Sequence, residues 1–262
     1  TLNATTGVVT FVALPGITVG TKTPLYYMAT DAVGNTVLST LTPIVPTAPA
    51  LVANTDTTPW DTTKTVNVLS NDTVDSALTL NASSLKLCVS TATTCTTTTL
   101  TIANQGTYTA NSDGTVSFDP LPTFSGVATP IKYFVADSMG QVRSTTLTMT
   151  VTAPNNPVAD PNTQYVIPGG TATFPSLKGT TGLAHPQTSS DPAITSVCLI
   201  GTLSTGTTCD ADGIVTVAGE GTYTLNATTG VVTFVALAGI TVGTKTPLYY
   251  MATDAAGHTV KS

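Results

Sequence analysis

The sequence predicts an all-β protein built from tandem antiparallel β-sandwich domains in an elongated array, and three observations support this prediction. Threonine accounts for 60 of the 262 residues, and this β-branched residue favours strands and suits helix interiors poorly. Charged residues make up only 8% of the chain, with a single glutamate, Glu220. Short runs of alternating apolar and polar residues recur between clusters of Gly, Pro, Asn and Asp, which is typical of strands and turns.

A long internal repeat organises the chain. Residues 1–37 and 224–260 share their sequence except at three positions, where Pro15/Ala238, Val33/Ala256 and Asn35/His258 differ. A fainter repeat divides this period, because residues 106–118 resemble 221–234 and residues 130–137 resemble 247–254. The unit is therefore about 105–117 residues long, the size of one domain.

Proline-containing segments separate these units. Thr47–Pro49 and Thr152–Pro154 are each followed by a short stretch that reads as extended, and proline stiffens such linkers by fixing φ. We therefore predict that residues 1–48 are the rear part of one repeat, that 49–153 form a complete repeat, and that 154–262 form a nearly complete repeat without its last strand.

The middle unit contains seven expected strands, bounded by turn-forming residues. Alternation is clearest in the last, where Leu147, Met149 and Val151 face one side and threonines face the other. Seven short antiparallel strands in about 105 residues fit an immunoglobulin-like β-sandwich. The expected strands are Thr65–Leu69, Leu85–Val89, Thr97–Ile102, Thr107–Ala110, Thr115–Phe118, Ile131–Ala136 and Ser144–Thr152.

Two segments of the middle unit read as hairpin turns, Asn111–Gly114 and Asp137–Gly140. Glycine supplies a positive φ, and Asp or Asn closes the turn with its side chain. Asp31, Asp137 and Asp254 recur at one position of the repeat. No partner acid or histidine recurs with them, so we interpret them as turn-closing residues and not as catalytic acids.

The order and spacing of these elements resemble the repeat of fibrillar bacterial surface adhesins of the CshA type. The resemblance covers the whole middle unit, the third unit mainly from Cys198 onward, and the first segment as the rear half of a repeat. The matching segments of the middle unit are Val66–Thr73, Gly106–Thr109, Asp113–Phe118, Pro120–Gly126, Thr129–Asp137 and Gly140–Gln141.

The resemblance implies a structural role for the chain. We expect a repeat segment of an extracellular fibre at a bacterial cell surface, in the shaft of a fibrillar adhesin that serves cell attachment or biofilm formation. Its partners would be neighbouring repeats, with host or cell-surface ligands bound by regions outside this sequence. Two alternatives stay open: a β-sandwich module that binds carbohydrate or protein, and a filament subunit assembled by donated strands.

The four cysteines lie in two close pairs, Cys88 with Cys95 and Cys198 with Cys209. None forms a C-x-x-C motif, which argues against a zinc or redox site. Local pairing is the simplest of the three possible arrangements, and we expect each disulfide to staple a hairpin. Disulfides indicate an oxidising compartment, in keeping with an extracellular location.

Composition excludes several functions. With eight Lys and Arg residues and a net charge of −6, the chain has too few cations for a nucleic-acid-binding face or for an anionic membrane surface. No apolar run approaches the length of a membrane span. We expect neither enzymatic activity nor a cofactor, because no nucleophile elbow is present and because the histidines, His185 and His258, read as surface loop residues.

Few residues are candidates for a binding site. Asp72 and Asp75 are weak calcium candidates, since calcium needs six to eight oxygen ligands and solvated turns explain both residues. Trp60 follows Pro59 in a loop-like stretch and is the best candidate for an exposed interface contact. Two tyrosine pairs could stack on sugars, but strand alternation places one member of each pair in the core; these are Tyr26 with Tyr27 and Tyr249 with Tyr250.

Two expectations concern the exterior and the ends. Strand threonines should face outward and give a neutral, hydroxyl-covered surface, which limits repulsion between neighbouring shafts. Thr1 and Ser262 both fall inside expected strands. We therefore expect this sequence to be a window in a longer array, with a polymer of strand-exchanging subunits as the rival interpretation.

Overall fold

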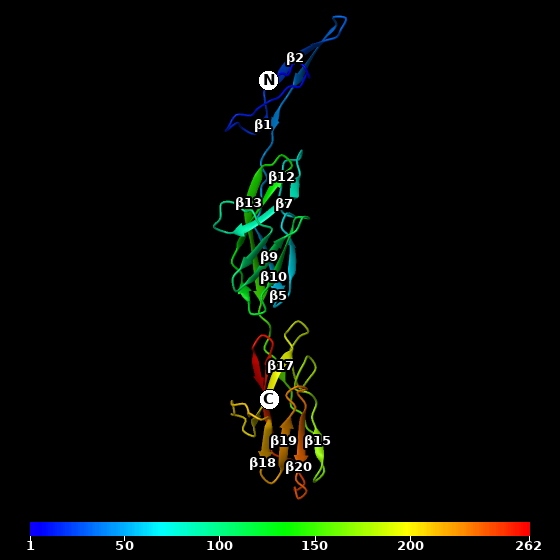
Figure 1. Cartoon of the computed structure of the whole chain (residues 1–262), viewed down its shortest axis with the longest axis vertical. Coiled ribbons are helices and arrows are strands. Elements are labelled where there is room, and N and C mark those ends of the chain that lie inside the picture. Colours follow the sequence, from blue (N-terminus) through cyan, green and yellow to red (C-terminus); the bar gives the residue numbers. More distant parts are fainter.

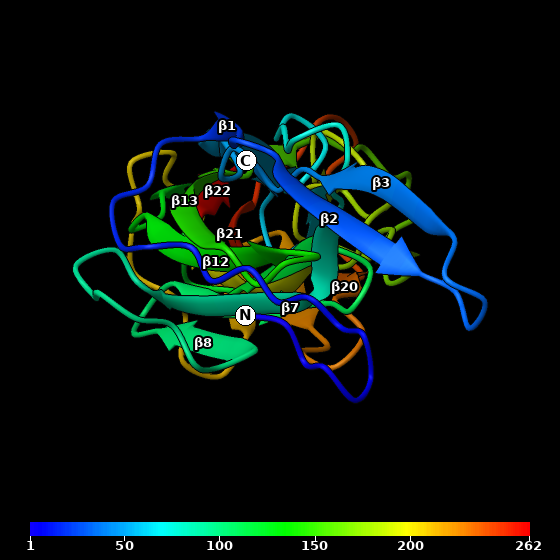
Figure 2. The ribbon, with the colours of Figure 1, turned by 90° about the horizontal axis from the view of Figure 1, so that it is seen from above.

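The computed structural model describes residues 1–262 and contains strands but no helix. Three groups of strands follow one another along a single axis, with the N-terminal segment at one end (Figure 1). Seen along that axis, the groups lie over one another (Figure 2). The predicted all-β, elongated architecture is thus confirmed. No helix is present that could cross a membrane.

The middle unit is a two-layer sandwich. One sheet has the order β6-β10-β9-β8 and the other has the order β11-β13-β12-β7, with β5 paired to β13. Alternate residues of both sheets point inward and form a core of 14 buried residues, which include Tyr108 and Phe118. The strands are β5 (Asn54–Pro59), β6 (Lys64–Asn67), β7 (Leu80–Val89), β8 (Thr99–Ile102), β9 (Gly106–Ala110), β10 (Thr115–Pro120), β11 (Gly126–Val127), β12 (Ile131–Asp137) and β13 (Val142–Thr152).

Strand β5 is absent from the sequence prediction, and it departs from the antiparallel pattern. It runs parallel to β13, from Asn54 opposite Leu147 to Pro59 opposite Thr152. The strand has no apolar alternation because its two buried residues are polar, Asn54 and Thr58. Hydrogen bonds replace apolar packing there: the Thr58 hydroxyl donates to the Thr62 carbonyl at 2.6 Å.

The third unit follows a similar plan, but its second sheet has three strands where that of the middle unit has five. Its larger sheet has the order β15-β20-β19-β18, its second sheet the order β17-β21-β22, and β14 pairs with β16. A separate core of 12 buried residues lies between the sheets. The strands are β14 (Val158–Ala159), β15 (Thr171–Thr173), β16 (Ala184–His185), β17 (Ile194–Gly201), β18 (Ile214–Val217), β19 (Gly221–Leu225), β20 (Val232–Ala236), β21 (Tyr249–Asp254) and β22 (Thr259–Lys261).

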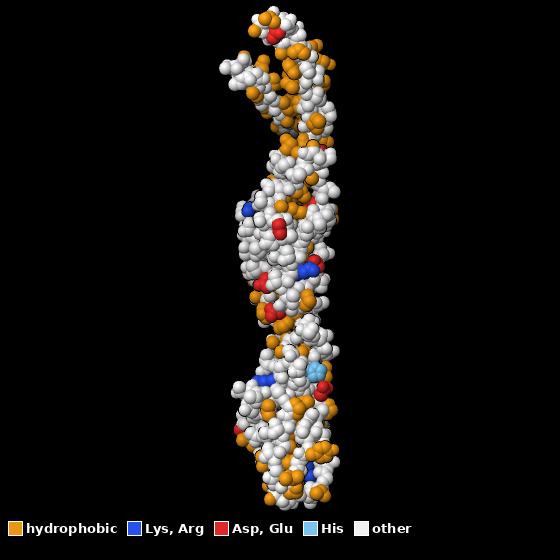
Figure 3. Space-filling view, turned by 90° about the vertical axis from the view of Figure 1, so that its right-hand side faces the viewer, with side chains coloured by type: hydrophobic (Ala, Val, Ile, Leu, Met, Phe, Trp, Pro, Cys, Tyr) orange, Lys and Arg blue, Asp and Glu red, His pale blue; other side chains and the backbone are white.

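The N-terminal segment has no buried core. It consists of two small antiparallel pairs, β1 with β4 and β2 with β3, and all residues of β2 and β3 are exposed. Hydrophobic side chains are concentrated on this part of the surface (Figure 3). The strands are β1 (Gly20–Thr21), β2 (Leu25–Thr30), β3 (Thr36–Leu41) and β4 (Ile44–Val45).

Threonine covers the exterior, as the sequence predicts. Thr58 is the single threonine among the buried residues, so nearly all of the hydroxyls face solvent or the molecular surface. Charged side chains are sparse on the face shown in Figure 3. The shaft therefore presents a nearly neutral, hydrogen-bonding surface.

Candidate functional site: linker contacts and open apolar surfaces

The linker that enters the middle unit is held by two aspartates, and we call these contacts the first linker clamp. The Asp75 carboxylate accepts hydrogen bonds from the Thr47 amide at 3.3 Å and from its hydroxyl at 3.4 Å. The Asp72 carboxylate accepts one from the Val52 amide at 2.7 Å. Between them, Ala50 and Thr73 exchange backbone hydrogen bonds at 2.9 and 3.0 Å. The extended chain is therefore tied to one loop, which restricts bending at this joint.

A buried polar group connects the first linker clamp to the core. The Asn54 amide donates at 2.9 Å to the Tyr133 hydroxyl and at 2.9 Å to the Val68 carbonyl. The Tyr133 hydroxyl lies 3.4 Å from the Asp72 carboxylate. Burial raises the pKa of Asp72, although the hydrogen bond from Val52 opposes this shift. Burial also raises the pKa of Tyr133, which stays protonated and acts as a donor.

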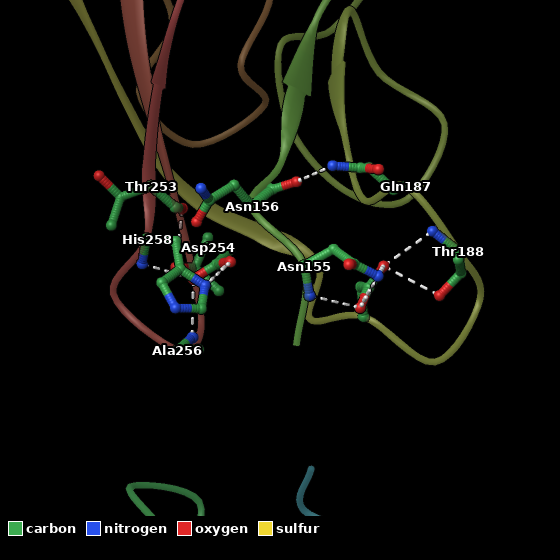
Figure 4. A network of polar contacts seen from close by, with 10 residues as sticks. Asn155, Asn156, Gln187, Thr188, Thr253, Asp254, Ala256 and His258 are labelled. Atoms are coloured by element: carbon green, nitrogen blue, oxygen red, sulfur yellow. Dashed lines mark hydrogen bonds and ion pairs between the residues drawn. The ribbon is translucent and has the colours of Figure 1, made fainter. Parts of the chain in front are cut away.

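A second linker clamp occurs where the chain enters the third unit (Figure 4). The Asp191 carboxylate accepts hydrogen bonds from the Asn155 amide at 2.9 Å and from the Asn155 side chain at 3.1 Å. Thr188 adds its amide and its hydroxyl, both at 2.9 Å. Burial opposes ionisation of Asp191, but these donors outweigh it and hold the pKa of Asp191 below its usual value.

The recurrent aspartates close turns, as predicted. Asp31, Asp137 and Asp254 each accept two backbone amides, from the second and fourth residues that follow. The side chain four residues on also donates to each carboxylate; it belongs to Asn35, Gln141 or His258, at 2.8, 2.9 and 3.1 Å. His258 therefore takes the place of an amide as the donor in a turn (Figure 4).

The cysteines form the two local disulfides, Cys88 with Cys95 and Cys198 with Cys209. Leu87 and Thr97, which flank the first disulfide, form an isolated antiparallel bridge, and the expectation that both disulfides staple hairpins stays a prediction. Strands β7 and β8 belong to different sheets, and so do β17 and β18. Each disulfide therefore braces the connection by which the chain passes from one sheet to the other.

Of the other candidate residues, Asp72 and Asp75 lie together in the first linker clamp. Asp72 and Asp75 are engaged by hydrogen-bond donors of the linker, and no group of three or more His, Cys, Asp or Glu side chains could hold a metal ion. Trp60 lies in the turn after β5 and is half-buried, so it is less exposed than expected. Its role in an interface stays a prediction.

The two copies of the long repeat have very different exposure. Phe234 and Val232 are 3% and 4% exposed in the third unit, whereas their counterparts Phe11 and Val9 are 53% and 36% exposed. In the third unit, Phe234 packs on Tyr223 with ring centroids 4.4 Å apart. In the N-terminal segment the same side chains form an open apolar surface.

The third unit contains a cavity of about 890 Å³. The residues that line it come from both sheets and from the segment 160–166, and more than half of these lining residues are apolar. The clamps, this cavity and the open surface were not foreseen from the sequence, because each depends on residues that are far apart in the chain. Residues that line the cavity include Phe174, Leu199, Tyr223, Phe234, Leu248 and Tyr250.

Comparison with solved structures finds distant tandem β proteins. The chain is 16% identical to the Bacteroides ovatus mixed-linkage glucan utilization locus SGBP-B in complex with a mixed-linkage heptasaccharide, over 81% of this chain and 42% of that one, with a TM-score of 0.21. It is 7% identical to PcdhgB3 EC1-4, over 93% of this chain and 62% of that one, with a TM-score of 0.31. The Streptococcus agalactiae AgI/II polypeptide BspA C-terminal domain is 12% identical over 91% of this chain and 97% of that one, with a TM-score of 0.20.

These TM-scores are all below 0.5, so we infer nothing about function from these structural similarities. Comparison with curated protein sequences gave no match. A family model does match residues 47–151, and its description is surface adhesin CshA repetitive domain. This is an adhesin repeat family and not an enzyme family, and the two disulfides agree with an extracellular location. Residues 47–151 of this chain are thus similar to the surface adhesin CshA repetitive domain.

Proposed function

We propose that the chain is a structural segment of the shaft of an extracellular bacterial fibre, in a fibrillar adhesin that serves cell attachment or biofilm formation. One observation carries the proposal: the units follow one another along one axis, and each linker is hydrogen-bonded to the unit that it enters (Figure 1). Flexibly joined modules would not need such clamps. A shaft that holds a distant adhesive region away from the cell does need them.

The middle unit is arranged to resist tension. The chain enters through β5 and leaves through β13, and these strands are parallel and paired over six register positions. Tension on the two linkers pulls the strands past each other in opposite directions. All of the hydrogen bonds between them are then loaded together instead of one after another.

The surface of the chain is better suited to contacts with neighbouring repeats, beside it or along the fibre axis, than to binding charged ligands. Threonine hydroxyls dominate it, and the whole chain carries only eight Lys and Arg residues. We propose that the partners are neighbouring repeats, and that host or cell-surface ligands bind elsewhere in the fibre. We assign neither catalysis nor a cofactor, since both histidines make surface contacts, His185 with Asp160 at 3.2 Å and His258 with Asp254 at 3.1 Å.

Single-molecule pulling on the full chain tests this proposal. The middle unit should unfold at a higher force than the third unit, which has no parallel pair equivalent to β5 and β13. Equal forces, or a weaker middle unit, would contradict the tension argument.

Small-angle X-ray scattering tests the shaft itself. The native chain should be a stiff rod, and D75A and D191A should increase bending at their own joints. D212A removes an equal charge from a turn that belongs to neither linker clamp and should leave the rod unchanged. A compact native particle, or clamp variants as stiff as the native chain, would overturn the proposed function.

A further inference from the structure

The two connections that the disulfides brace are rich in hydroxyl side chains, and we call them the hydroxyl loops. Eight of the ten residues 90–99 are Ser or Thr, and so are five of the seven residues 202–208. Turns and loops usually contain Gly, Pro, Asn or Asp, which suit a change of chain direction, but residues 90–99 include none of these four types. The composition of the first loop therefore indicates a need for hydroxyl groups that the turn itself does not explain.

The backbone of each hydroxyl loop is fixed in the same way. The disulfide ties the loop to the strand that precedes it. A lysine of a neighbouring strand then donates to a carbonyl near the middle of the loop. In the first loop, Lys132 of β12 donates to Ala92 at 2.8 Å. In the second, Lys261 of β22 donates to Gly206 at 3.0 Å. Both loops are thus held in a defined position.

The side-chain hydroxyls of these loops are left free. Strand hydroxyls bond to one another, as Thr65 does with Ser117 at 2.9 Å. In the hydroxyl loops, only the half-buried Thr97 makes a side-chain hydrogen bond, with the backbone of Thr99. The exposed hydroxyl residues are Thr91, Thr93, Thr94, Thr96, Thr98 and Thr99 in the first loop and Ser204, Thr205, Thr207 and Thr208 in the second.

The two hydroxyl loops protrude from the same side of the shaft. The first, in teal, and the second, in gold, both lie on the left in Figure 1 and again in the perpendicular view of Figure 2. A bulky group attached to both loops therefore projects from one side and leaves the other sides free for neighbouring repeats.

The hydroxyl loops lack the groups that recognise a free ligand. Residues 90–99 and 202–208 include no charged and no aromatic side chain, and Leu203 is their one large apolar residue. Ligand sites are usually concave and lined by apolar and aromatic side chains. A covalently attached sugar requires only an exposed acceptor hydroxyl, because the transferase supplies the recognition. Segments dense in Ser and Thr are typical of O-glycosylated stalks.

We propose that the exposed threonines of the two hydroxyl loops are O-glycosylation sites. In the transfer, a threonine Oγ1 bonds to the anomeric carbon of a nucleotide-activated sugar. The bond from that carbon to the diphosphate breaks, the nucleoside diphosphate leaves, and the hydroxyl proton passes to a base of the transferase. Only 8% of the chain is charged, and weakly charged surfaces promote association. Sugars on one side keep the chain soluble. This inference goes beyond the shaft function, since it assigns a covalent modification.

Glycopeptide mapping of the full chain, isolated from its native cell surface, tests the proposal. Fragmentation by electron transfer keeps sugars attached and locates them. Peptides with residues 90–99 and 202–208 should carry sugars at an occupancy at least tenfold higher than Thr228. This control residue is exposed in the turn between β19 and β20, and its hydroxyl makes no hydrogen bond. Loops without sugars, or equal occupancy at Thr228, would overturn the proposal.

Valine variants made in the same cells supply the second measurement. Valine keeps the branched shape of threonine and removes the hydroxyl. A chain with T91V, T93V, T94V and T96V should lose most of the sugar mass of the first loop and keep that of the second, whereas T228V should keep the native mass. A first-loop variant with the native mass would refute the assignment.

Two further outcomes separate this inference from other interpretations. Sugar that is released when the chain is denatured would indicate a bound ligand and would overturn covalent attachment. A native chain without sugars that is still a stiff rod in scattering would contradict glycosylation and leave the shaft function standing.

Discussion

Replacing the same phenylalanine in each copy of the long repeat distinguishes the effect of local sequence on stability from the effect of the tertiary environment. Phe234 and Phe11 lie within nearly identical sequences, but they are 3% and 53% exposed. We predict that F234A destabilises the third unit strongly. F11A should leave both folded units unchanged, because the segment around Phe11 has no buried core.

The magnitude follows from the buried area. A phenylalanine side chain buries roughly 200 Å² in a core, so the difference of half its surface between the two sites is worth about 2.5 kcal/mol at 25 cal/mol per Å². Cavity formation and loss of the ring contact with Tyr223, whose centroid lies 4.4 Å away, add to this. Phe→Ala substitutions in cores typically cost about 3–5 kcal/mol, and we expect about 4 kcal/mol for F234A.

Hydrogen exchange followed by mass spectrometry measures each unit separately. A loss of about 4 kcal/mol lowers protection in β19 and β20 by roughly 10³-fold, at 1.4 kcal/mol per tenfold change. Strand β12 of the middle unit serves as the internal reference and should not change. If F234A does not fold, F234L should show a smaller loss of about 1–2 kcal/mol. Equal effects of F11A and F234A would refute the reasoning.

Three further predictions concern other parts of the shaft. The disulfides join residues 7 and 11 positions apart. Reducing them should lower the free energy of unfolding by about 2.5 kcal/mol in the middle unit and about 2.8 kcal/mol in the third. Denaturation midpoints of the two units that do not change when reductant is added would contradict this. G221A should destabilise the third unit by about 1–3 kcal/mol, because a Cβ there would meet the Val235 carbonyl and lie 2.7 Å from the Phe234 ring. If calorimetry shows that the third unit of G221A unfolds at the same temperature as in the native chain, the predicted clash is disproved. D191A should cost about 2 kcal/mol, and the contribution is pH-dependent. The donors lower the pKa of Asp191 in the folded state, so its stabilisation is present above about pH 3.9 and is lost as the pH falls through the lower folded value. The stability of D191A should therefore fall less steeply than that of the native chain below pH 4, and parallel curves would exclude the mechanism.

Much of the fold was predictable from local patterns. The strands with inward apolar residues, such as β12 and β13, follow from alternation. The turns follow from Asp, Asn and Gly. Strand β5 was missed because its buried residues, Asn54 and Thr58, are polar and are stabilised by hydrogen bonds that apolar alternation does not reveal. The Asn155–Asp191 clamp was missed because the two residues are 36 positions apart.

The two copies of the long repeat show which structural features depend on local sequence alone and which depend on tertiary structure. Asn3 and Asn226 accept the same pair of amides, two and three residues on, in both copies. Asp31 and Asp254 likewise close the same turn. These contacts form within five residues, so the local sequence determines them whether or not a core is present.

Strand formation and burial differ between the same two copies. Val232–Ala236 forms β20 between β15 and β19, whereas the identical residues 9–13 form no strand and stay exposed. Conversely, Gly20–Thr21 is a strand and Gly243–Thr244 is not. A strand requires a partner to satisfy its backbone groups and an opposite layer to bury its side chains. The sequence by itself therefore determined the turns and the capacity for strands, and only the tertiary structure decided which segments became strands.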